Sequence, residues 1–373
     1  MAGRIVLFGA TGYTGELTAR ALLDGPGAVR PVLAGRSEAR VRALAQELGG
    51  LEWALADVSE PHSVRALVQA GDVLVSTVGP FARWGEPAVR AAVDAGAHYL
   101  DSTGEGSFIR TVFETHGPRA HAAGCGLLTA FGYDWVPGNL AGALALSDAG
   151  ESATRVRIGY FNTGPPTGPG SMSGGTRASV AGVMLDPAFA FRDGRLVSER
   201  GGRRRHSFQL APGKLGEAIS VGSSEHLTLP RVHPALREVD VYLGWFGPAS
   251  RVLQGLSLGT AGLTRVPGVK AALEAVSARL VPGSTGGPDA AARARSGSLV
   301  IAEAFDATGA RLAGARVEGV NGYDFTARIL AWGARTAAAG GLRGVGALGP
   351  VDGFGLDALQ AGCAEAGIER SKS

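Results

Sequence analysis

Three glycines near the start of the chain have the spacing of a phosphate-binding turn. Residues 6–8 are apolar, and Gly9, Gly12 and Gly15 follow in the pattern G-x-x-G-x-x-G before a stretch with helical periodicity. In such a turn the first glycine permits a tight bend, the second lets the backbone approach a pyrophosphate, and the third lets the helix pack closely on the strand. Unpaired N–H groups at the helix start would face the anion. The pattern therefore predicts a dinucleotide site, with a purely structural turn as the alternative, formed by Gly9, Ala10, Thr11, Gly12, Tyr13, Thr14 and Gly15.

The end of the second predicted strand indicates which dinucleotide is bound. Residues 30–36 form this strand, and Arg36 and Ser37 stand where NAD-specific folds usually carry an acid. Such an acid holds the ribose 2′-hydroxyl of NAD, whereas an arginine accommodates the 2′-phosphate of NADP. A guanidinium can also grip a phosphate through two parallel hydrogen bonds. We therefore expect NADP(H), bound by Arg36 and Ser37; the alternative is a surface arginine before a helix that Ser37 caps.

Two further strand ends are expected to contact the cofactor. A third strand over residues 51–56 leads into Asp57 and Val58, near the expected adenine, although Asp57 could instead cap the helix after Pro61. Residues 72–78 are almost continuously apolar, as in a central parallel strand that is buried on both faces. Because the carboxyl ends of parallel strands face the ligand crevice, the end of this run should lie beside the nicotinamide. The residues expected there are Thr77, Val78, Gly79, Pro80 and Phe81.

Proton donors are expected at the ends of the fifth strand, residues 98–101, and the sixth strand, residues 126–131. The seven histidines lack metal-binding spacing and no G-x-S-x-G motif is present, so we expect no metal and hydride transfer by the cofactor. The protein would supply orientation and a proton, and the predicted catalytic residues are Tyr133, Asp134 and Tyr99, with Asp101 as a further candidate. Each has a structural alternative. Tyr99 could belong to the core, Asp134 could brace its turn, and Asp101 could accept hydrogen bonds from backbone N–H groups.

A particular set of elements is needed to bring these residues together. Six strands alternating with helices up to residue 137 predict an α/β fold with an N-terminal Rossmann domain and a doubly wound parallel sheet. Beyond Pro137 the alternation stops, and a second, α+β domain is predicted from strand-like segments over residues 155–161, 216–221, 239–243, 297–304 and 314–318. We expect residues 1–137 to bind NADP, residues 138–340 to bind substrate and to dimerise, and residues 341–373 to return as a helical segment to the Rossmann domain. The loop over residues 163–175 is long enough to act as a lid.

Composition places the chain among ordinary globular proteins. It has 373 residues, of which 45% are hydrophobic and 18% are charged, with a formal net charge of +3, and we expect no nucleic-acid partner. Two distant cysteines predict neither a disulfide framework nor a zinc site, and no leader is evident before the first strand, so we expect a cytoplasmic protein. Residues 241–263 carry one charge, but Pro248 and several glycines argue against membrane insertion and leave peripheral contact or an apolar pocket wall open. The basic run over residues 203–206 is interpreted as a solvated loop, with binding of anions or an acidic partner as the alternative.

Several motifs, taken together, resemble one known family. They are Gly-Ala-Thr-Gly-Tyr-Thr-Gly at residues 9–15, Ala-Gly-Arg at 34–36, Val-Gly-Pro-Phe at 78–81, Tyr-Leu-Asp-Ser-Thr-Gly-Glu at 99–105, Gly-Tyr-Asp-Trp-Val-Pro at 132–137, Ser-Gly-Gly-Thr at 173–176 and Gly-Tyr-Asp-Phe-Thr-Ala at 322–327. The set is similar to that of the saccharopine dehydrogenase-like family, which includes saccharopine reductases and the trans-acting enoyl reductases of polyketide lipid assembly. Tyr133 departs from this family, whose usual residue at the position is Phe.

The resemblance implies an NADP(H)-dependent oxidoreductase that transfers a hydride to an activated C=C or C=N bond. The apolar segment over residues 241–263 favours a hydrophobic, acyl-like or carrier-linked small molecule. Saccharopine itself would need basic groups for several carboxylates, and the sequence does not identify them. A homodimer is compatible with the sequence. The alternative function is a catalytically silent NADP(H)-binding protein that senses redox state or assembles partners.

Overall fold

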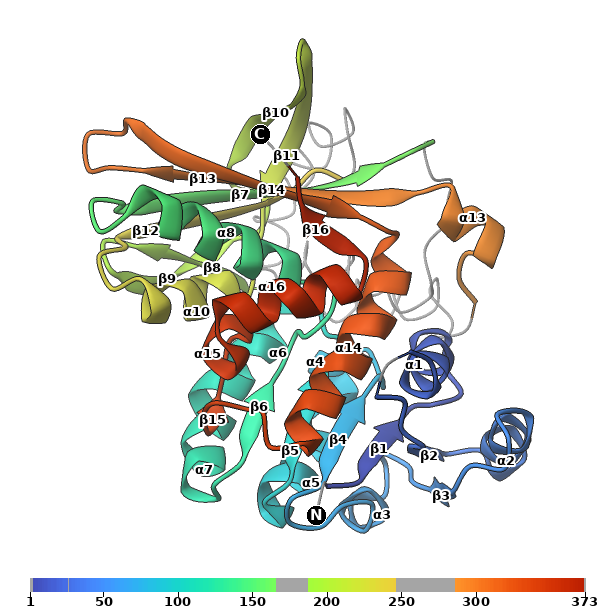
Figure 1. The fold of residues 1–373 in the computed structure, drawn as a ribbon. Helices are drawn as coiled ribbons and strands as arrows, with labels where there is room; N and C mark the ends of the chain where they lie inside the picture. Colours follow the sequence, from blue (N-terminus) through green and yellow to red (C-terminus); the bar gives the residue numbers. More distant parts are fainter. Residues whose placement is uncertain (1–2, 26, 166–186, 246–285, 372–373) are drawn as a thin grey trace, which may run out of the picture. The chain divides into compact units, whose positions relative to one another are not determined.

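The chain folds into two compact units. The computed structural model describes residues 3–25, 27–165, 187–245 and 286–371 (Figure 1). The first unit contains Met1–Gly104, Phe108–Leu140 and Val320–Glu369, and the second contains Glu105–Ser107, Ala141–Gly319 and Arg370–Ser373. The boundary after Leu140 falls inside helix α8 (Val136–Ala149), close to the expected boundary at residue 137. Residues 320–340 belong to the first unit, whereas the sequence placed them in the second.

A parallel sheet of seven strands forms the centre of the first unit. In order across the sheet, the strands are β15 (Gly346–Ala347), β6 (Gly126–Leu128), β5 (His98–Asp101), β4 (Val73–Ser76), β1 (Ile5–Phe8), β2 (Val32–Gly35) and β3 (Trp53–Leu55). The strand order reverses between β1 and β4, as in a Rossmann sheet. Every residue of β1 and β4 is buried, which explains their continuous apolar sequences.

Helices connect these strands and cover the sheet. They are α1 (Tyr13–Leu23), α2 (Glu38–Glu47), α3 (Pro61–Arg65), α4 (Phe81–Trp84), α5 (Glu86–Ala95), α6 (Gly106–Thr111), the π-helical turn η1 (Val112–His116), α7 (Gly117–Ala122), α14 (Gly322–Ala338), α15 (Pro350–Phe354) and α16 (Leu356–Glu365). Between β5 and β6 the chain forms α6, η1 and α7 in succession. Figure 1 shows α14 beside α1, and α14 also contacts β1, β4 and β5. This packing places α14 in the first unit.

A sheet of nine strands with mixed directions forms the second unit. Its main path is β10 (Arg205–Ala211), β11 (Lys214–Ser220), β12 (Glu238–Leu243), β7 (Arg155–Thr163), β13 (Gly297–Phe305), β14 (Arg311–Gly319) and β16 (Ile368–Arg370), with β8 (Pro187–Arg192) pairing with β12 and β9 (Arg195–Arg200) pairing with β8. Among its described residues, the helices are most of α8, α10 (Glu225–Val232) and α13 (Ala290–Ala294). The sequence did not predict β9 and β10, because arginine, serine and other polar residues interrupt any apolar run there. The predicted fold class, a Rossmann unit joined to an α+β unit, is confirmed.

Three predictions fall outside the residues that the structure describes. They concern most of the loop over residues 163–175, the Ser-Gly-Gly-Thr motif at 173–176 and the apolar segment from residue 246 onward. Within the described ranges, no helix has both the length and the apolar character needed to cross a membrane.

Candidate functional site

The glycine turn after β1 has the close packing that a phosphate-binding turn requires. Gly9 has a φ of +86°, and a Cβ atom there would lie 2.8 Å from both Thr77 Oγ1 and Val78 Cγ2. A Cβ atom on Gly15 would lie 2.2 Å from the carbonyl oxygen of Gly9, so α1 can approach the strand this closely only with glycine at that position. Gly12 is the N-cap of α1, and its N–H donates to the Gly9 carbonyl over 2.9 Å. A bulkier residue at either outer glycine would displace the turn.

Hydrogen bonds tie this turn to the neighbouring strand ends. The Thr77 hydroxyl donates to the carbonyl oxygens of Phe8 and Gly9, at 3.2 and 3.1 Å. The N–H groups of Gly9 and Ala10 both donate to the Ala34 carbonyl at the end of β2, at 2.9 and 3.1 Å. The carboxyl ends of β1, β2 and β4 therefore meet at the turn. The structure thus brings together residues that the sequence predicted separately.

Two arginines stand beside the turn at the start of α2. Arg36 is exposed directly after β2, where a 2′-phosphate is expected, and Ser37 is the N-cap of α2 although its side chain makes no capping hydrogen bond. Arg40, one helical turn later, donates from Nη2 to the Thr11 carbonyl over 2.7 Å. Arg40 was not predicted from the sequence, because its role depends on a hydrogen bond to Thr11, 29 residues away. The pair fits a phosphorylated adenosine next to the glycine turn.

Asp57 braces the loop that follows β3. Its Oδ1 accepts hydrogen bonds from the N–H and the hydroxyl of Ser59, both at 2.8 Å. These hydrogen bonds lower the pKa of Asp57, and the positive charge of Arg36 contributes further. Glu60, rather than Asp57, is the N-cap of α3, so the alternative that Asp57 caps this helix is wrong. Val58 is partly buried and packs against the core of the first unit.

The loop after β4 presents the Thr77 hydroxyl and backbone groups at the sheet edge, whereas its Phe81 side chain is buried. Phe81 is 6% exposed, and its ring lies 5.7 Å from that of Phe108, so its side chain belongs to the core. Val78 is partly buried against the same core cluster. Pro80 is the N-cap residue of α4 and Gly79 precedes it. Any contact of Phe81 with a cofactor would therefore come from its main chain.

Asp101, at the end of β5, is held by several hydrogen bonds. Its Oδ1 accepts from the N–H groups of Thr103 and Ala130, at 2.9 and 2.8 Å, and its Oδ2 accepts from the Thr129 hydroxyl at 2.8 Å. Burial raises the pKa of Asp101 to about 6, although these hydrogen bonds oppose the rise. Ala130 has a positive φ of 59°, an uncommon conformation that the bond to Asp101 helps to hold. Asp101 is thus a brace between the ends of β5 and β6, as its structural alternative proposed.

Asp134, beyond β6, has a different environment. The Oδ1 atom of Asp134 is buried and has no hydrogen-bond partner among the described residues, although Asp134 as a whole is partly exposed. Burial raises the pKa of Asp134 to about 7. Its Oδ2 lies against Gly104, where a Cβ atom would be 3.0 Å away. Buried acids without partners are uncommon in proteins and are concentrated at functional sites. Asp134 is therefore the candidate that can carry a proton near neutral pH.

The two predicted tyrosines are packed side chains. Tyr99 is fully buried in the core, and burial, together with the nearby charge of Asp101, raises the pKa of its hydroxyl well above the usual value. Tyr99 therefore lies in the core, as its structural alternative proposed, and its catalytic role stays a prediction. Tyr133 is 6% exposed, and its ring fills the space beside Gly322, where a Cβ atom would be 2.8 Å from Cδ1.

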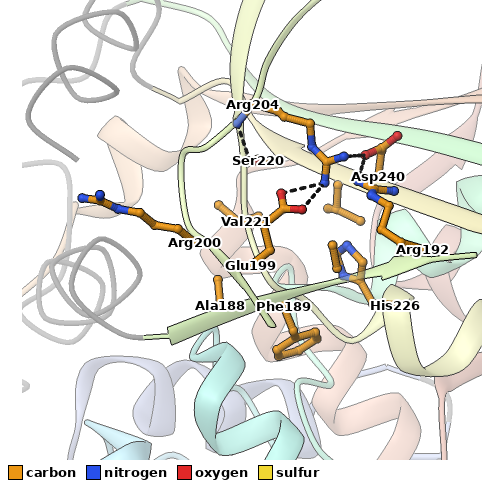
Figure 2. Close-up of a pocket in the computed structure, with 12 residues that line it drawn as sticks. Ala188, Phe189, Arg192, Glu199, Arg200, Arg204, Ser220, Val221, His226 and Asp240 are labelled. Atoms are coloured by element: carbon orange, nitrogen blue, oxygen red, sulfur yellow. Dashed lines mark hydrogen bonds and ion pairs between the residues drawn. The ribbon is translucent and has the colours of Figure 1, made fainter. Parts of the chain in front are cut away.

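The second unit contains a small pocket lined by both charged and apolar residues (Figure 2). Glu199 accepts hydrogen bonds from Arg204 Nη2 at both carboxylate oxygens, at 2.6 and 2.7 Å, and Arg204 also lies 3.7 Å from Asp240. Arg192 donates to the same Asp240 carboxylate. Arg204 therefore belongs to an ion-pair network, so the expected solvated loop over residues 203–206 is wrong for this residue.

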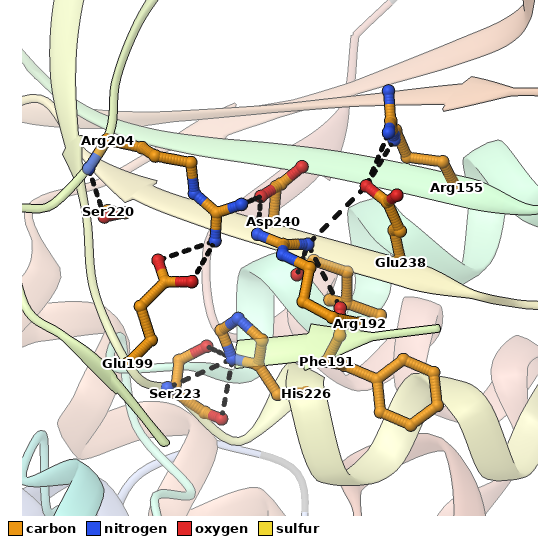
Figure 3. A network of polar contacts seen from close by, with 11 residues as sticks. Arg155, Phe191, Arg192, Glu199, Arg204, Ser220, Ser223, His226, Glu238 and Asp240 are labelled. Atoms are coloured by element: carbon orange, nitrogen blue, oxygen red, sulfur yellow. Dashed lines mark hydrogen bonds and ion pairs between the residues drawn. The ribbon is translucent and has the colours of Figure 1, made fainter. Parts of the chain in front are cut away.

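Figure 3 shows that the ion-pair network also includes Arg155 and Glu238. Arg155 and Arg192 lie 2.5 and 3.8 Å from Glu238, so three arginines face three carboxylates and their charges cancel. His226 is fully buried, its Nδ1 lies 3.0 Å from the Ser223 hydroxyl, and burial lowers the pKa of His226 to about 4. A neutral histidine in a charge-balanced network indicates a structural role. Among the described residues, no three His, Cys, Asp or Glu side chains form a metal-binding group.

Comparisons with known proteins agree with this geometry. Residues 5–125 match the sequence profile of the saccharopine dehydrogenase NADP-binding domain. A protein of Mycobacterium tuberculosis (strain ATCC 25618 / H37Rv), provisionally named a trans-acting enoyl reductase, is 31% identical over 366 residues, which cover 87% of this chain and 86% of that protein. The trans-acting enoyl reductase of Mycobacterium leprae (strain TN) is 41% identical over 140 residues, covering 36% of this chain and 34% of that protein.

A solved structure extends the likeness to the second unit. Saccharopine dehydrogenase (L-Glu forming) from Saccharomyces cerevisiae matches 99% of both chains with a TM-score of 0.61, and its identity of 13% limits that likeness to the fold. The NADP-binding profile lies on the glycine turn and the strand ends that approach it. Because one relative shares 31% identity along most of both chains, this chain belongs to the saccharopine dehydrogenase-like family of NADP-dependent oxidoreductases.

Proposed function

We propose that this oxidoreductase reduces the activated C=C bond of an acyl-like, enoyl substrate, with NADPH as hydride donor and Asp134 as proton donor. The observation that carries the proposal is the buried Asp134 carboxyl, which has no partner among the described residues and whose pKa is raised to about 7. Asp134 follows β6, and the glycine turn follows β1, at the carboxyl edge of one parallel sheet. In sheets of this kind that edge is where ligands bind.

The residues around the turn fit NADP(H). The glycines at 9 and 15 let the turn pack tightly against β4 and the start of α1. We propose that a pyrophosphate binds at this turn, on the N–H groups at the N-terminus of α1. Arg36 and Arg40 would hold the 2′-phosphate, and Arg40 already contacts the turn through Thr11. When bound, NADPH supplies the hydride. The first unit would thus bind the cofactor, and we propose that the second unit contributes to substrate binding.

The proton balance of the reaction defines the task of Asp134. Addition of a hydride to the β-carbon of an enoyl thioester moves the C=C electron pair toward the carbonyl group. The α-carbon must then receive a proton, and the Asp134 O–H bond would break to supply it. A carboxyl with a pKa near neutral pH is suited to this step, because it is protonated often enough to donate and still releases the proton readily. Solvent would afterwards return a proton to the carboxylate.

An acyl-like substrate is favoured over an amino-acid conjugate for two reasons. The two relatives from Mycobacterium described above carry the name of enoyl reductases. Three arginines of the second unit, Arg155, Arg192 and Arg204, are already paired with carboxylates of the chain itself. These arginines would be poor receptors for the carboxylates of saccharopine, because a ligand would have to displace their partners. The homodimer and the cytoplasmic location stay predictions.

Turnover with defined substrates tests the proposal. We expect the purified chain to oxidise NADPH in the presence of a medium-chain trans-2-enoyl pantetheine thioester and not in the presence of the saturated thioester. Asp134→Asn should bind NADPH with unchanged affinity and lose about a hundredfold or more in turnover, the scale of general acid catalysis. Binding of NADPH without turnover of any enoyl or imine substrate would instead support the redox-sensor alternative. Full activity of Asp134→Asn would exclude Asp134 as the donor.

A further inference from the structure

We infer that Thr326, in the first turn of α14, is a positioning residue that holds the Asp134 loop in place; this inference rests on the proposed role of Asp134. The Thr326 hydroxyl oxygen accepts a hydrogen bond from the Tyr133 N–H over 2.9 Å. The same hydroxyl donates its proton to the Gly322 carbonyl over 2.7 Å. Tyr133 directly precedes Asp134, so this bond fixes the backbone from which the carboxyl projects.

Packing in the same turn leaves the loop little freedom. Gly322 lies against the ring of Tyr133, where even a Cβ atom would be 2.8 Å from Cδ1. The Phe325 ring meets that of Tyr133 nearly at right angles, with the ring centres 6.5 Å apart. Gly132 lies against Thr326, because a Cβ atom on Gly132 would be 3.0 Å from Thr326 Cγ2. Three residues of α14 therefore hold the two residues that precede Asp134.

The same turn of α14 also reaches the cofactor turn. The Tyr323 ring meets the ring of Tyr13 edge-on, with the centres 5.1 Å apart and the planes at 90°. Tyr13 begins α1, immediately after the glycine turn. The N-cap Asn321 side chain accepts a hydrogen bond from the Tyr323 N–H, which orders the start of the helix. The first turn of α14 thus connects the nucleotide turn with the proton-donor loop.

This arrangement accounts for where the Asp134 carboxyl lies. Several titratable or charged residues lie on the segments beside Asp134. They are His98, Tyr99 and Asp101 on β5, Glu105 next to Gly104 in the sequence, Tyr133 on the same loop, and Tyr323, Asp324, Arg328 and Arg335 on α14. None of them contributes to the raised pKa of Asp134, whose cause is burial. A loop that moved away from α14 would give the carboxyl more water, and its pKa would fall toward the usual value.

A change of Thr326 to Val tests the hydrogen bond while keeping the shape of the side chain. If the pKa of Asp134 fell from about 7 to about 5, the protonated fraction at pH 7 would drop from about one half to about one hundredth, roughly a 50-fold loss of kcat. We expect kcat to recover at pH 5, KM for NADPH to stay near that of the unchanged protein, and Thr326→Ser to restore the original pH profile. A matched control is Thr336→Val, because Thr336 makes the same kind of bond, to the Trp332 carbonyl over 2.8 Å, in the last turn of the same helix.

The outcomes separate this inference from the proposed function. A Thr326→Val protein that unfolds at lower temperature but keeps the original pH profile of kcat would overturn the inference. Full activity of Asp134→Asn would instead refute the proposed role of Asp134. If Thr326→Val does not fold, Gly322→Ala provides the second test, since its methyl group must displace the Tyr133 ring. An unchanged pH profile in a folded Gly322→Ala protein would count equally against the inference.

Discussion

Replacing Arg36 by Ala should separate the binding of NADPH from that of NADH. Arg36 is exposed at the end of β2, and the exposed Arg40 follows it on α2 with its guanidinium bound to the Thr11 carbonyl. The two cofactors differ by the 2′-phosphate alone, so a residue that contacts this group must affect one cofactor and spare the other. A hydrogen bond to a charged group contributes about 1.5–3 kcal/mol. Arg36→Ala should therefore raise the Kd of NADPH roughly 10- to 150-fold and leave that of NADH nearly unchanged.

Arg40 should behave differently, because it also supports the turn. Its hydrogen bond to Thr11 over 2.7 Å stabilises the backbone that both cofactors contact. Arg40→Ala should weaken the binding of NADPH by a similar amount. It should also weaken the binding of NADH, by about 1 kcal/mol, the contribution of an ordinary hydrogen bond. Arg42→Ala is the matched control, because it removes the same charge from an exposed position of the same helix.

Fluorescence titration of both cofactors measures these effects without any substrate. The NADPH preference should also shrink as salt is added, since exposed charges are screened. An equal loss of NADPH and NADH affinity in Arg36→Ala would refute the prediction that Arg36 contacts the 2′-phosphate. A loss of the same size in Arg42→Ala would show that net charge, rather than contact with the 2′-phosphate, is the cause.

Three further changes probe the site. Asp134→Asn should stabilise the protein at pH 8, by up to about 4 kcal/mol, because a pKa raised from 3.8 to about 7 means that the ionised carboxylate destabilises the native state. That gain should fade as the pH falls through 7 and vanish near pH 4, where the carboxyl is protonated in both states; thermal unfolding at pH 8 and pH 5 with equal gains would contradict this account. Gly15→Ala should abolish NADPH binding and destabilise the fold by about 1–3 kcal/mol, because its methyl group would meet a backbone oxygen at 2.2 Å. Calorimetry measures the loss of stability, and a normal affinity of this variant for NADPH would contradict the tight turn. Tyr133→Phe should keep turnover near the original value, because the ring that packs beside Gly322 is retained; a loss of about a hundredfold would instead make the hydroxyl a proton donor.

Local sequence was sufficient for the nucleotide turn. A strand, three spaced glycines and a helix follow one another within residues 5–23. The two outer glycines, Gly9 and Gly15, are each needed for a close contact inside that stretch or with the residues after β4. The apolar runs of β1 and β4 likewise reflect burial on both faces, which shows in the sequence itself. Arg36 was found for the same reason, because it stands at a fixed place relative to a strand.

The position of α14 could not be predicted in this way. The sequence of α14 is a good helix, but its packing beside α1 joins residues about 300 positions apart, and no local pattern records such a contact. The short strand β15 has two residues and is a strand because β6 offers it a pairing edge. Arg40 acts on the turn through a hydrogen bond to a residue 29 positions away.

Asp101 and Asp134 show which properties of the site the sequence could predict and which it could not. It determined that two aspartates lie at or after the ends of neighbouring parallel strands, at the carboxyl edge where such sheets bind ligands. It could not determine which aspartate braces the fold and which can carry a proton. Thr103, Thr129 and Ala130 surround Asp101 with donors, whereas Asp134 Oδ1 is buried without one among the described residues. Tertiary structure decides this difference, because the pKa of a carboxyl depends on the donors and the burial that distant parts of the chain provide.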